Sequence, residues 1–411
     1  MKIHRGEQMK IHQQLISRIK DQGGVTAILI AIVIAFLISV TALAVDIGYV
    51  MTTKNELQNV ADAAALAATR QLGAIYQSMP YAQQQSYVCD PATILPIAKD
   101  VAGKNRAGGK NITLNDSDII IGQWDANTKT LTPTLNQPDA VEVTARRDGG
   151  ANGPITTFFA RILGINTVAV GADATAALTG QATAGDGDLE IPIGISSFFF
   201  NPGERCNDWI KFSPTHDPDS CAGWTTFDMS PSNDVTIRRI LQEVPGYTNP
   251  DTTAGETGFE FIGGDLSTPT FDALLLLFMN KGYDVRADGI TPVVNDGNGD
   301  PVTGPLPDGT PGTVPLTDDA GNRLYYPTDP PTPRNKHIWE TTVVVYEWYD
   351  CSNPNTQITV GGFTTVRLID VKGAPDKTLI GKVMCNVVDS EDSRGGGGEY
   401  GTKGNIPGLV E

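Results

Sequence analysis

The chain has 411 residues, of which 47 are acidic and 30 are basic, and its formal net charge is −17. A strongly acidic chain is repelled by phosphate backbones, so the composition excludes nucleic acid as a partner.

The first predicted element is a membrane-spanning helix. Val25–Val45 is a run of 21 residues without a charged side chain. About 20 helical residues cross a hydrocarbon layer roughly 30 Å thick. A cleaved secretory signal has a shorter apolar core, about 7 to 15 residues, followed by a small-residue cleavage site. The sequence therefore predicts a retained membrane helix over residues 25–45, preceded by a flank at residues 1–24.

The charges on either side of this run predict its orientation. The flank has a local charge of +3, which leaves −20 for the rest of the chain; its charged residues are Lys2, Arg5, Lys10, Arg18 and Lys20 against Glu7 and Asp21. Basic flanks stay in the cytoplasm. We therefore expect a cytoplasmic N-terminus, a single pass, and an acidic remainder outside the cytoplasm.

A second helical pattern follows directly, from Asp46 to Leu72. Together the two helices could form one rod of roughly 50 residues, about 75 Å long, with Gly48 as its one joint. A face of small residues, Ala61, Ala64, Ala65 and Ala68, could admit another helix or a sheet, or the alanines could serve helix propensity alone. Asp46 is either an interfacial helix residue or pairs with a neighbouring subunit. Asp62 is a further candidate for assembly contacts.

The rest of this region predicts a small sheet. Residues 95–107 are expected to form a helix, and residues 118–124 and 129–134 a hairpin, because a turn sequence separates two strand patterns. In residues 140–146, apolar and polar side chains alternate, as expected of a half-buried strand. Residues 155–163 are expected to form a short amphipathic helix, and residues 168–178 a closing strand. The fold class is therefore α+β, a long helix packed on a small antiparallel sheet over residues 46–179.

A second domain is expected after a Gly-rich linker at residues 180–188. Residues 189–411 contain strand patterns, two predicted helices and a Pro/Gly/Asp-rich insertion at residues 284–333. The strand patterns lie at residues 189–200, 341–349, 357–369 and 378–388, and the helices at residues 234–243 and 271–280. The Gly-rich segment 393–401 is expected to be flexible. This domain is predicted to be β-rich with long loops.

All five cysteines lie beyond the predicted span, where disulfides can form. Cys206 with Cys221 and Cys351 with Cys385 are the predicted pairs because each pair lies within one local segment, which leaves Cys89 free. Cys206, His216 and Cys221 could alternatively be zinc ligands, but a fourth ligand at a suitable spacing is missing.

Catalytic motifs are absent from the sequence: it has no nucleophile elbow, phosphate loop, dinucleotide fingerprint or HExxH helix. Two patterns approach metal sites. Asp228, Ser230 and Ser232 have the DxSxS spacing of a metal-dependent adhesion site, but residues 223–227 do not form the buried apolar strand that should precede it, and a cap for the helix at residue 234 is the better interpretation. Residues 295–300 resemble half a calcium loop, but Pro301 and Pro307 interrupt the pattern and favour an ordinary turn. No cofactor is expected.

The N-terminal half resembles a known family. Gly23-Gly24-Val25, the apolar run, Ala42 to Tyr49 and Leu57 to Ala68 are similar to the N-terminal signature of TadG-like proteins of the Tad/Flp pilus-assembly system. Three later segments continue the resemblance to about residue 180, namely Gly122 to Asp125, Ala140 to Thr144 and Phe158 to Gly164. The fifth position after Gly24 is Leu29, whereas prepilin-type processing usually requires Glu there.

The resemblance implies a pseudopilin-like protein anchored in the bacterial inner membrane, without catalytic activity and without a cofactor. The implied partners are the inner membrane, other pilus-assembly membrane proteins or pilins, and a second copy of the chain. The competing hypothesis is a metal-dependent adhesin or ligand-binding receptor whose specificity lies in residues 189–411.

Overall fold

The computed structural model describes residues 4–200, 209–212, 221–262, 266–285, 294–295, 301–302, 336–351, 356–375 and 377–410. The chain divides into two compact units. The first unit consists of residues 1–63, 99–118 and 143–173, and the second of residues 64–98, 119–142 and 174–411.

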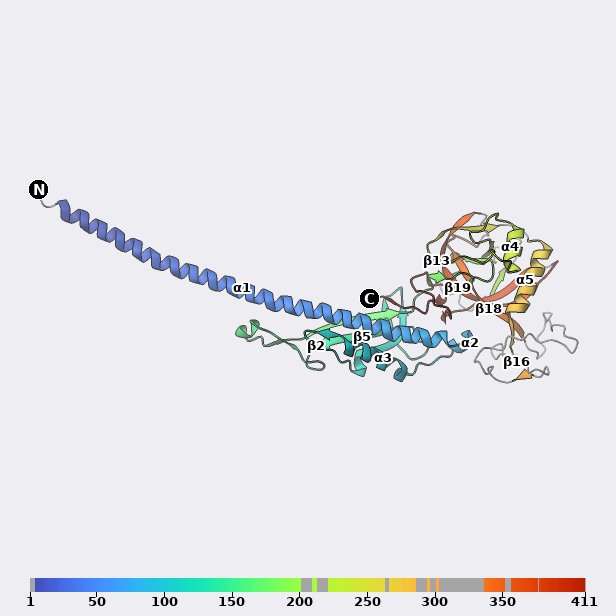
Figure 1. Ribbon diagram of the computed structural model, residues 1–411, viewed down its shortest axis with the longest axis horizontal. Coiled ribbons are helices and arrows are strands. Elements are labelled where there is room, and N and C mark those ends of the chain that lie inside the picture. Colours follow the sequence, from blue (N-terminus) through green and yellow to red (C-terminus); the bar gives the residue numbers. More distant parts are fainter. Residues whose placement is uncertain are drawn as a thin grey trace. The chain divides into compact units, whose positions relative to one another are not determined.

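One helix, α1 (His4–Gln77), contains both helical segments that the sequence predicts, and Figure 1 shows it as a single rod. The helix is longer than the predicted rod and passes through Gly48 without a break. Its apolar stretch is exposed, and two hydroxyls within that stretch bond to the preceding turn of the helix. Ser39 Oγ donates to the carbonyl of Ala35 and Thr41 Oγ1 to that of Leu37, each at 2.8 Å. Such bonds to the preceding turn remove the cost of placing a hydroxyl in an apolar environment.

A five-stranded sheet has the order β23-β8-β5-β3-β4. The predicted hairpin is confirmed, since β3 and β4 pair antiparallel, with Gly122 opposite Pro133. Helix α3 precedes the sheet and starts four residues earlier than predicted, with Pro96 inside it. The bounds are β3 (Ile119–Asp125), β4 (Thr130–Pro133), β5 (Ala140–Arg147), β8 (Val170–Ala177), β23 (Gly408–Leu409), α2 (Tyr81–Gln84) and α3 (Pro91–Lys104). The long helix and the antiparallel strands together confirm the predicted α+β class.

The Gly-rich segment 393–401, predicted to be flexible, is hydrogen-bonded to other parts of the chain: the N–H of Gly397 donates to the carbonyl of Gly180 at 2.8 Å, and that of Gly395 to the carbonyl of Ile406 at 3.1 Å. The residues that follow it also make contacts. β23 pairs antiparallel with β8 at the edge of the five-stranded sheet. Lys403 forms a buried ion pair with Asp139. Arg70 of α1 donates to the carbonyl oxygen of Asn405 at 3.0 Å, and a Cβ atom at Gly73 would collide with the same carbonyl. Within the predicted flexible segment, a Cβ atom at Gly397 would collide with the carbonyl of Gln181. The glycine composition that suggested mobility therefore permits close packing of two backbones here.

An eight-stranded sheet forms most of the rest of the second unit, in the order β11-β20-β19-β14-β12-β10-β18-β15. An additional pairing of β19 with β18 closes five of these strands into a ring. β10 and β18 are parallel, and the other pairs in this sheet are antiparallel. The strands are β10 (Ile193–Ser196), β11 (Trp209–Phe212), β12 (Ala222–Thr225), β14 (Thr257–Ile262), β15 (Tyr283–Val285), β18 (Lys336–Tyr346), β19 (Gln357–Lys372) and β20 (Thr378–Val383).

Two helices in this unit confirm predicted ones, α4 (Asp234–Leu241) and α5 (Thr268–Lys281). Their apolar sides enter a core of buried strand residues, in which Trp224 packs edge-on against Phe271 at 5.9 Å between ring centroids. A second cluster contains Phe261 and Tyr346, whose centroids lie 4.5 Å apart. Such aromatic pairs contribute about 0.5–1.5 kcal/mol beyond the area they bury.

The remaining elements are short. They are β1 (Arg106–Ala107), β2 (Lys110–Asn111), β6 (Ile155–Thr156), β7 (Thr167–Val168), β9 (Thr183–Ala184), β13 (Thr252–Thr253), β16 (Val294–Asn295), β17 (Pro301–Val302), β21 (Val387–Val388) and β22 (Thr402–Lys403), with the 3₁₀ helices η1 (Asp116–Asp118), η2 (Ala160–Leu163) and η3 (Ser197–Phe200). The predicted linker, residues 180–188, contains β9, which pairs with β13. Most of the predicted insertion at residues 284–333 lies outside the described residues, as do residues 296–300.

The predicted cysteine pairs are wrong. Cys221 is bonded to Cys351, 130 residues away, and Cys385 is also in a disulfide. Cys206 and His216 lie outside the described residues. The prediction relied on short sequence separation, but the fold brings β12 and the end of β18 together through β10. Cys89 is free and buried, and burial raises the pKa of its thiol.

Candidate functional site

The site lies in the first unit, where the apolar part of α1 ends. Among the described residues, one helix is long and apolar enough to cross a membrane, and its most apolar window has no buried residues. Exposed large apolar side chains continue from Val25 to Met51. From Leu57 onward, one face of the same helix is buried.

Asp46, the first charged residue after the apolar run, is buried and bonded to its own chain. Its carboxylate accepts hydrogen bonds from the backbone N–H groups of Phe158 at 2.7 Å, Phe159 at 2.9 Å and Ala160 at 2.6 Å. Three amide donors on one carboxylate compensate for its removal from water. Asp46 therefore fastens the segment at residue 158 to α1.

The fastened segment is a closed loop, residues 157–166, which we call the apolar loop. Strands β6 and β7 pair antiparallel at its base. Thr157 Oγ1 donates to the carbonyl of Ile165 at 2.6 Å. The loop contains η2, which ends at Gly164 with φ of +86°.

This geometry corrects the predicted amphipathic helix at residues 155–163. Ile155 and Thr156 are in a strand, and only one short 3₁₀ turn forms after them. The left-handed conformation at Gly164 favours glycine and ends the turn. The N–H groups at the start of this turn donate to the carboxylate of Asp46, which is distant in sequence. The conformation of the segment therefore could not be predicted from its local apolar spacing alone.

Tyr49, one turn further along α1, also contacts the apolar loop. Its ring lies edge-on to that of Phe158, with centroids 5.5 Å apart. Its hydroxyl donates to the carbonyl of Gly108 at 3.2 Å. Tyrosine at the end of a membrane span is typical of the membrane–water interface.

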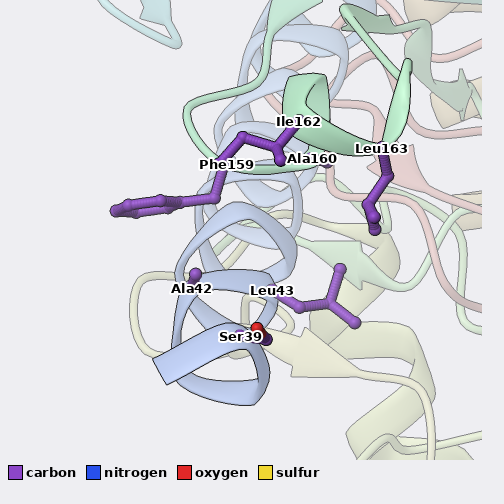
Figure 2. A pocket seen from close by; sticks show the side chains of 7 residues that line it. All are labelled: Ser39, Ala42, Leu43, Phe159, Ala160, Ile162 and Leu163. Carbon is purple, nitrogen blue, oxygen red and sulfur yellow. The ribbon is translucent and has the colours of Figure 1, made fainter. Parts of the chain in front are cut away.

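A small apolar cavity of about 90 Å³ lies between α1 and the apolar loop. The helix supplies Ser39, Ala42 and Leu43, and the loop supplies Phe159, Ala160, Ile162 and Leu163 (Figure 2). In Figure 2 the side chain of Leu163 points toward Leu43, while the ring of Phe159 points away from the helix. The loop thus lies against turns of α1 that belong to the predicted span.

The other predicted assembly residues are engaged within the chain. Asp62 accepts a hydrogen bond at 2.9 Å from Gln58, one turn earlier on α1. The small face, Ala61, Ala64, Ala65 and Ala68, is completely buried. Nearby, Thr69 donates to the carbonyl of Ala176 on β8 at 3.1 Å. The packing of α1 on β8 therefore accounts for small residues on this face.

The three residues of the adhesion-site pattern do not lie in the expected context. Asp228 and Ser230 are exposed. They follow β12, which pairs antiparallel with both neighbours, whereas the motif belongs at the end of a parallel strand. Asn233 accepts a hydrogen bond from the N–H of Thr236 at 3.0 Å and caps α4, and the motif residue Ser232 immediately precedes this cap.

A second cavity, of about 470 Å³, lies within the second unit and is acidic. Asp389 is its most deeply buried carboxylate, and burial raises the pKa of this group to about 6, with the charges of Asp188 and Glu391 adding to the effect. Among the described residues, no group of three His, Cys, Asp or Glu side chains is placed to hold a metal ion.

Sequence reasoning found Asp46 but missed the apolar loop as a site. The sequence predicts a short amphipathic helix for most of this segment. The available signal was composition, because the loop has five large apolar residues and only Arg161 as a charged residue, in a segment too short for a stable helix.

One long helix is apolar and exposed in its first part and packs on a small antiparallel sheet in its later part. This arrangement defines a pilin-like α+β protein. Comparison with known families agrees with this class. Residues 23–74 match the Flp pilus-assembly TadE/G-like family, and residues 51–176 match the Tad-like Flp pilus-assembly C-terminal family. The N-terminal part of the chain, residues 23–176, is therefore similar to TadG-like proteins of Flp pilus assembly. No curated protein and no solved structure matches it.

Proposed function

We propose that this chain is a membrane-anchored, non-enzymatic structural component of a Tad/Flp pilus-assembly apparatus. It crosses the bacterial inner membrane once through residues 25–45, with residues 1–24 in the cytoplasm and the remainder outside it. Its partners are other pilus-assembly membrane proteins or pilins. The proposal makes Asp46 and the alanine face internal supports of the anchored module rather than partner contacts.

The observation that carries the proposal is the continuity of α1. One helix contains both the exposed apolar stretch and the turns that pack on β8, and Gly48 does not interrupt it. The folded part of the chain is thus joined to the proposed span by uninterrupted helix. This arrangement suits an anchored part of an assembly machine, and the similarity to Flp pilus-assembly families supports the kind of machine.

Alkaline extraction and protease accessibility test the anchor. The full chain with a C-terminal tag should remain in alkali-washed membranes, and protease added to spheroplasts should remove the tag. Two aspartates near the centre of the span, Val33→Asp and Leu37→Asp, should release the protein, because each costs about 2.5–3.5 kcal/mol there. The matched control replaces exposed apolar residues outside the span, Val235→Asp and Leu276→Asp, and should leave the protein in the membrane.

Purification of the tagged chain from detergent-solubilised envelopes tests the assembly role. We expect other Tad membrane proteins or pilins to co-purify with it, or the tag to occur in sheared surface fibres. Complete extraction by alkali, or a tag protected from protease, would contradict the anchor. A chain that is anchored but found with neither fraction would contradict the assembly role alone.

A further inference from the structure

The apolar loop is the second large exposed apolar surface of the first unit. Its five large apolar residues, Phe158, Phe159, Ile162, Leu163 and Ile165, are all exposed. Ile162 and Leu163 protrude furthest, with 82% and 75% of their surfaces accessible. Contiguous exposed apolar side chains of this kind mark a contact with a membrane or with another protein.

The position of the loop along α1 favours a membrane. The helix residues that line the shared cavity, Ser39, Ala42 and Leu43, lie three to seven residues before Asp46. At 1.5 Å per residue, the loop reaches about 5 to 10 Å along the helix into the apolar run. Twenty-one helical residues span about 31 Å, hardly more than the hydrocarbon itself, so the last turns of the run lie within the bilayer. A loop beside these turns meets the same lipid.

The chemistry of the loop fits the apolar and interfacial part of a leaflet. Between Ile155 and Val170, the one charged residue is Arg161, whose exposed side chain is long enough to reach phosphate groups from a shallow depth. Tyr49 and Phe158 form an aromatic pair at the level where the span ends. The loop backbone is largely self-satisfied through β6, β7 and the carboxylate of Asp46, as an apolar environment requires.

We propose that the apolar loop inserts into the bilayer leaflet at the C-terminal end of the span and forms a second membrane contact beside α1. This inference rests on the proposed membrane anchor. One helix alone can rotate and tilt in a bilayer, whereas a helix and an adjacent loop together fix the rotation of the module about the helix axis. Asp46 acts here as a positioning residue that holds the loop against the helix.

Lipid is favoured over a protein partner because the exposed apolar surface of the loop is continuous with that of the span. Ile162 and Leu163 are exposed, as are the large apolar residues of the span, and the cavity between Leu43 and Leu163 joins the two surfaces. A second copy of the chain, or a helix of another membrane protein, is the alternative occupant, and the test below separates it from lipid.

The test uses the full chain in bacterial membranes with a photoactivatable diazirine amino acid at one position at a time. The positions are Phe36 in the span, Ile162 in the loop, and Leu276, an equally apolar and exposed residue of α5 in the second unit. After illumination, lipid adducts and protein adducts are separated by mass. We expect lipid adducts at Phe36 and Ile162, roughly tenfold above those at Leu276.

The outcomes distinguish the two proposals. Lipid adducts at Phe36 but none at Ile162, or protein adducts at Ile162, would overturn the loop insertion and leave the anchor intact. No lipid adduct at Phe36 would overturn the anchor and the loop insertion with it. A second variant, Leu163→Ser combined with the label at Ile162, should lower the lipid adduct at Ile162, because a polar neighbour makes insertion less favourable.

Discussion

At the scale of single residues, the two aspartates singled out by the sequence illustrate how a carboxylate in an apolar context finds its partners. Asp46 accepts from three backbone amides more than 110 residues away in sequence, and Asp62 from Gln58 on its own helix. Asp46 is buried, whereas Asp62 is only partly buried. The charge of Asp46 at the end of an apolar run indicated that this residue needs a partner. Which segment supplies the partner depended on the tertiary fold.

Asp389 provides a prediction about pH. Burial raises its pKa from 3.8 to about 6, so the folded state holds a proton that the unfolded state has already lost between these values. Stability contributed by this group is therefore lost as the pH rises from about 4 to 6. Relative to wild type, Asp389→Asn should gain roughly 2–3 kcal/mol in free energy of unfolding between pH 4 and pH 7. Urea titration of the full chain in detergent at several pH values measures the difference.

The control for this prediction is Asp173→Asn, at an exposed carboxylate of the first unit. Its pH profile of stability should run parallel to that of wild type. If the Asp389→Asn profile is parallel as well, Asp389 is not a buried acid with a raised pKa.

At the scale of elements, regular patterns were predictive and irregular ones were not. The helix of α1, the hairpin of β3 and β4, and helices α4 and α5 follow from periodicity and turn residues. The apolar loop did not, because its conformation depends on β6–β7 pairing and on Asp46. For the alanine face, the sequence left open close packing or helix propensity alone, and the structure buries the face within its own chain.

The alanine face gives a prediction about packing. Ala64→Leu should destabilise the folded chain by about 1–3 kcal/mol, because a completely buried alanine leaves no room for three more carbon atoms. Asn59→Leu, at an exposed position on the same helix, is the matched control and should change stability by less than about 0.5 kcal/mol. Chemical denaturation of the two variants measures both values. Equal effects would show that the alanine face is loosely packed.

At the scale of the whole molecule, long-range connections in the second unit decide the architecture. The ring of strands closes through a parallel pairing of β10 with β18, about 150 residues apart in sequence, and through β18 with β19. The Cys221–Cys351 bond joins the same regions. The segment after β20 returns to α1 and β8.

The disulfide is directly testable. Proteolysis without reduction, followed by mass spectrometry, should give a peptide that joins Cys221 to Cys351. Replacing both by alanine should lower stability by roughly 4–5 kcal/mol, since the bond closes a loop of 130 residues in the unfolded chain. A peptide that joins Cys206 to Cys221 would contradict the structure and favour the local pairing. Cys89→Ala, at a free cysteine, is the control for loss of a thiol.

The apolar stretch, its continuation as one helix, the α+β class and the similarity to Flp pilus-assembly proteins could all be predicted from the sequence, because each depends on local composition or on an ordered series of short motifs. The tertiary structure alone decided three other features: the partner of Asp46, the path of the last 30 residues, and the disulfide that closes the second unit. These depend on contacts between segments far apart in the chain, and neither hydrophobic periodicity nor residue spacing carries information about which distant segments meet. The apolar loop illustrates both cases: its composition can be read from the sequence, whereas its place beside the apolar stretch of α1 depends on the fold.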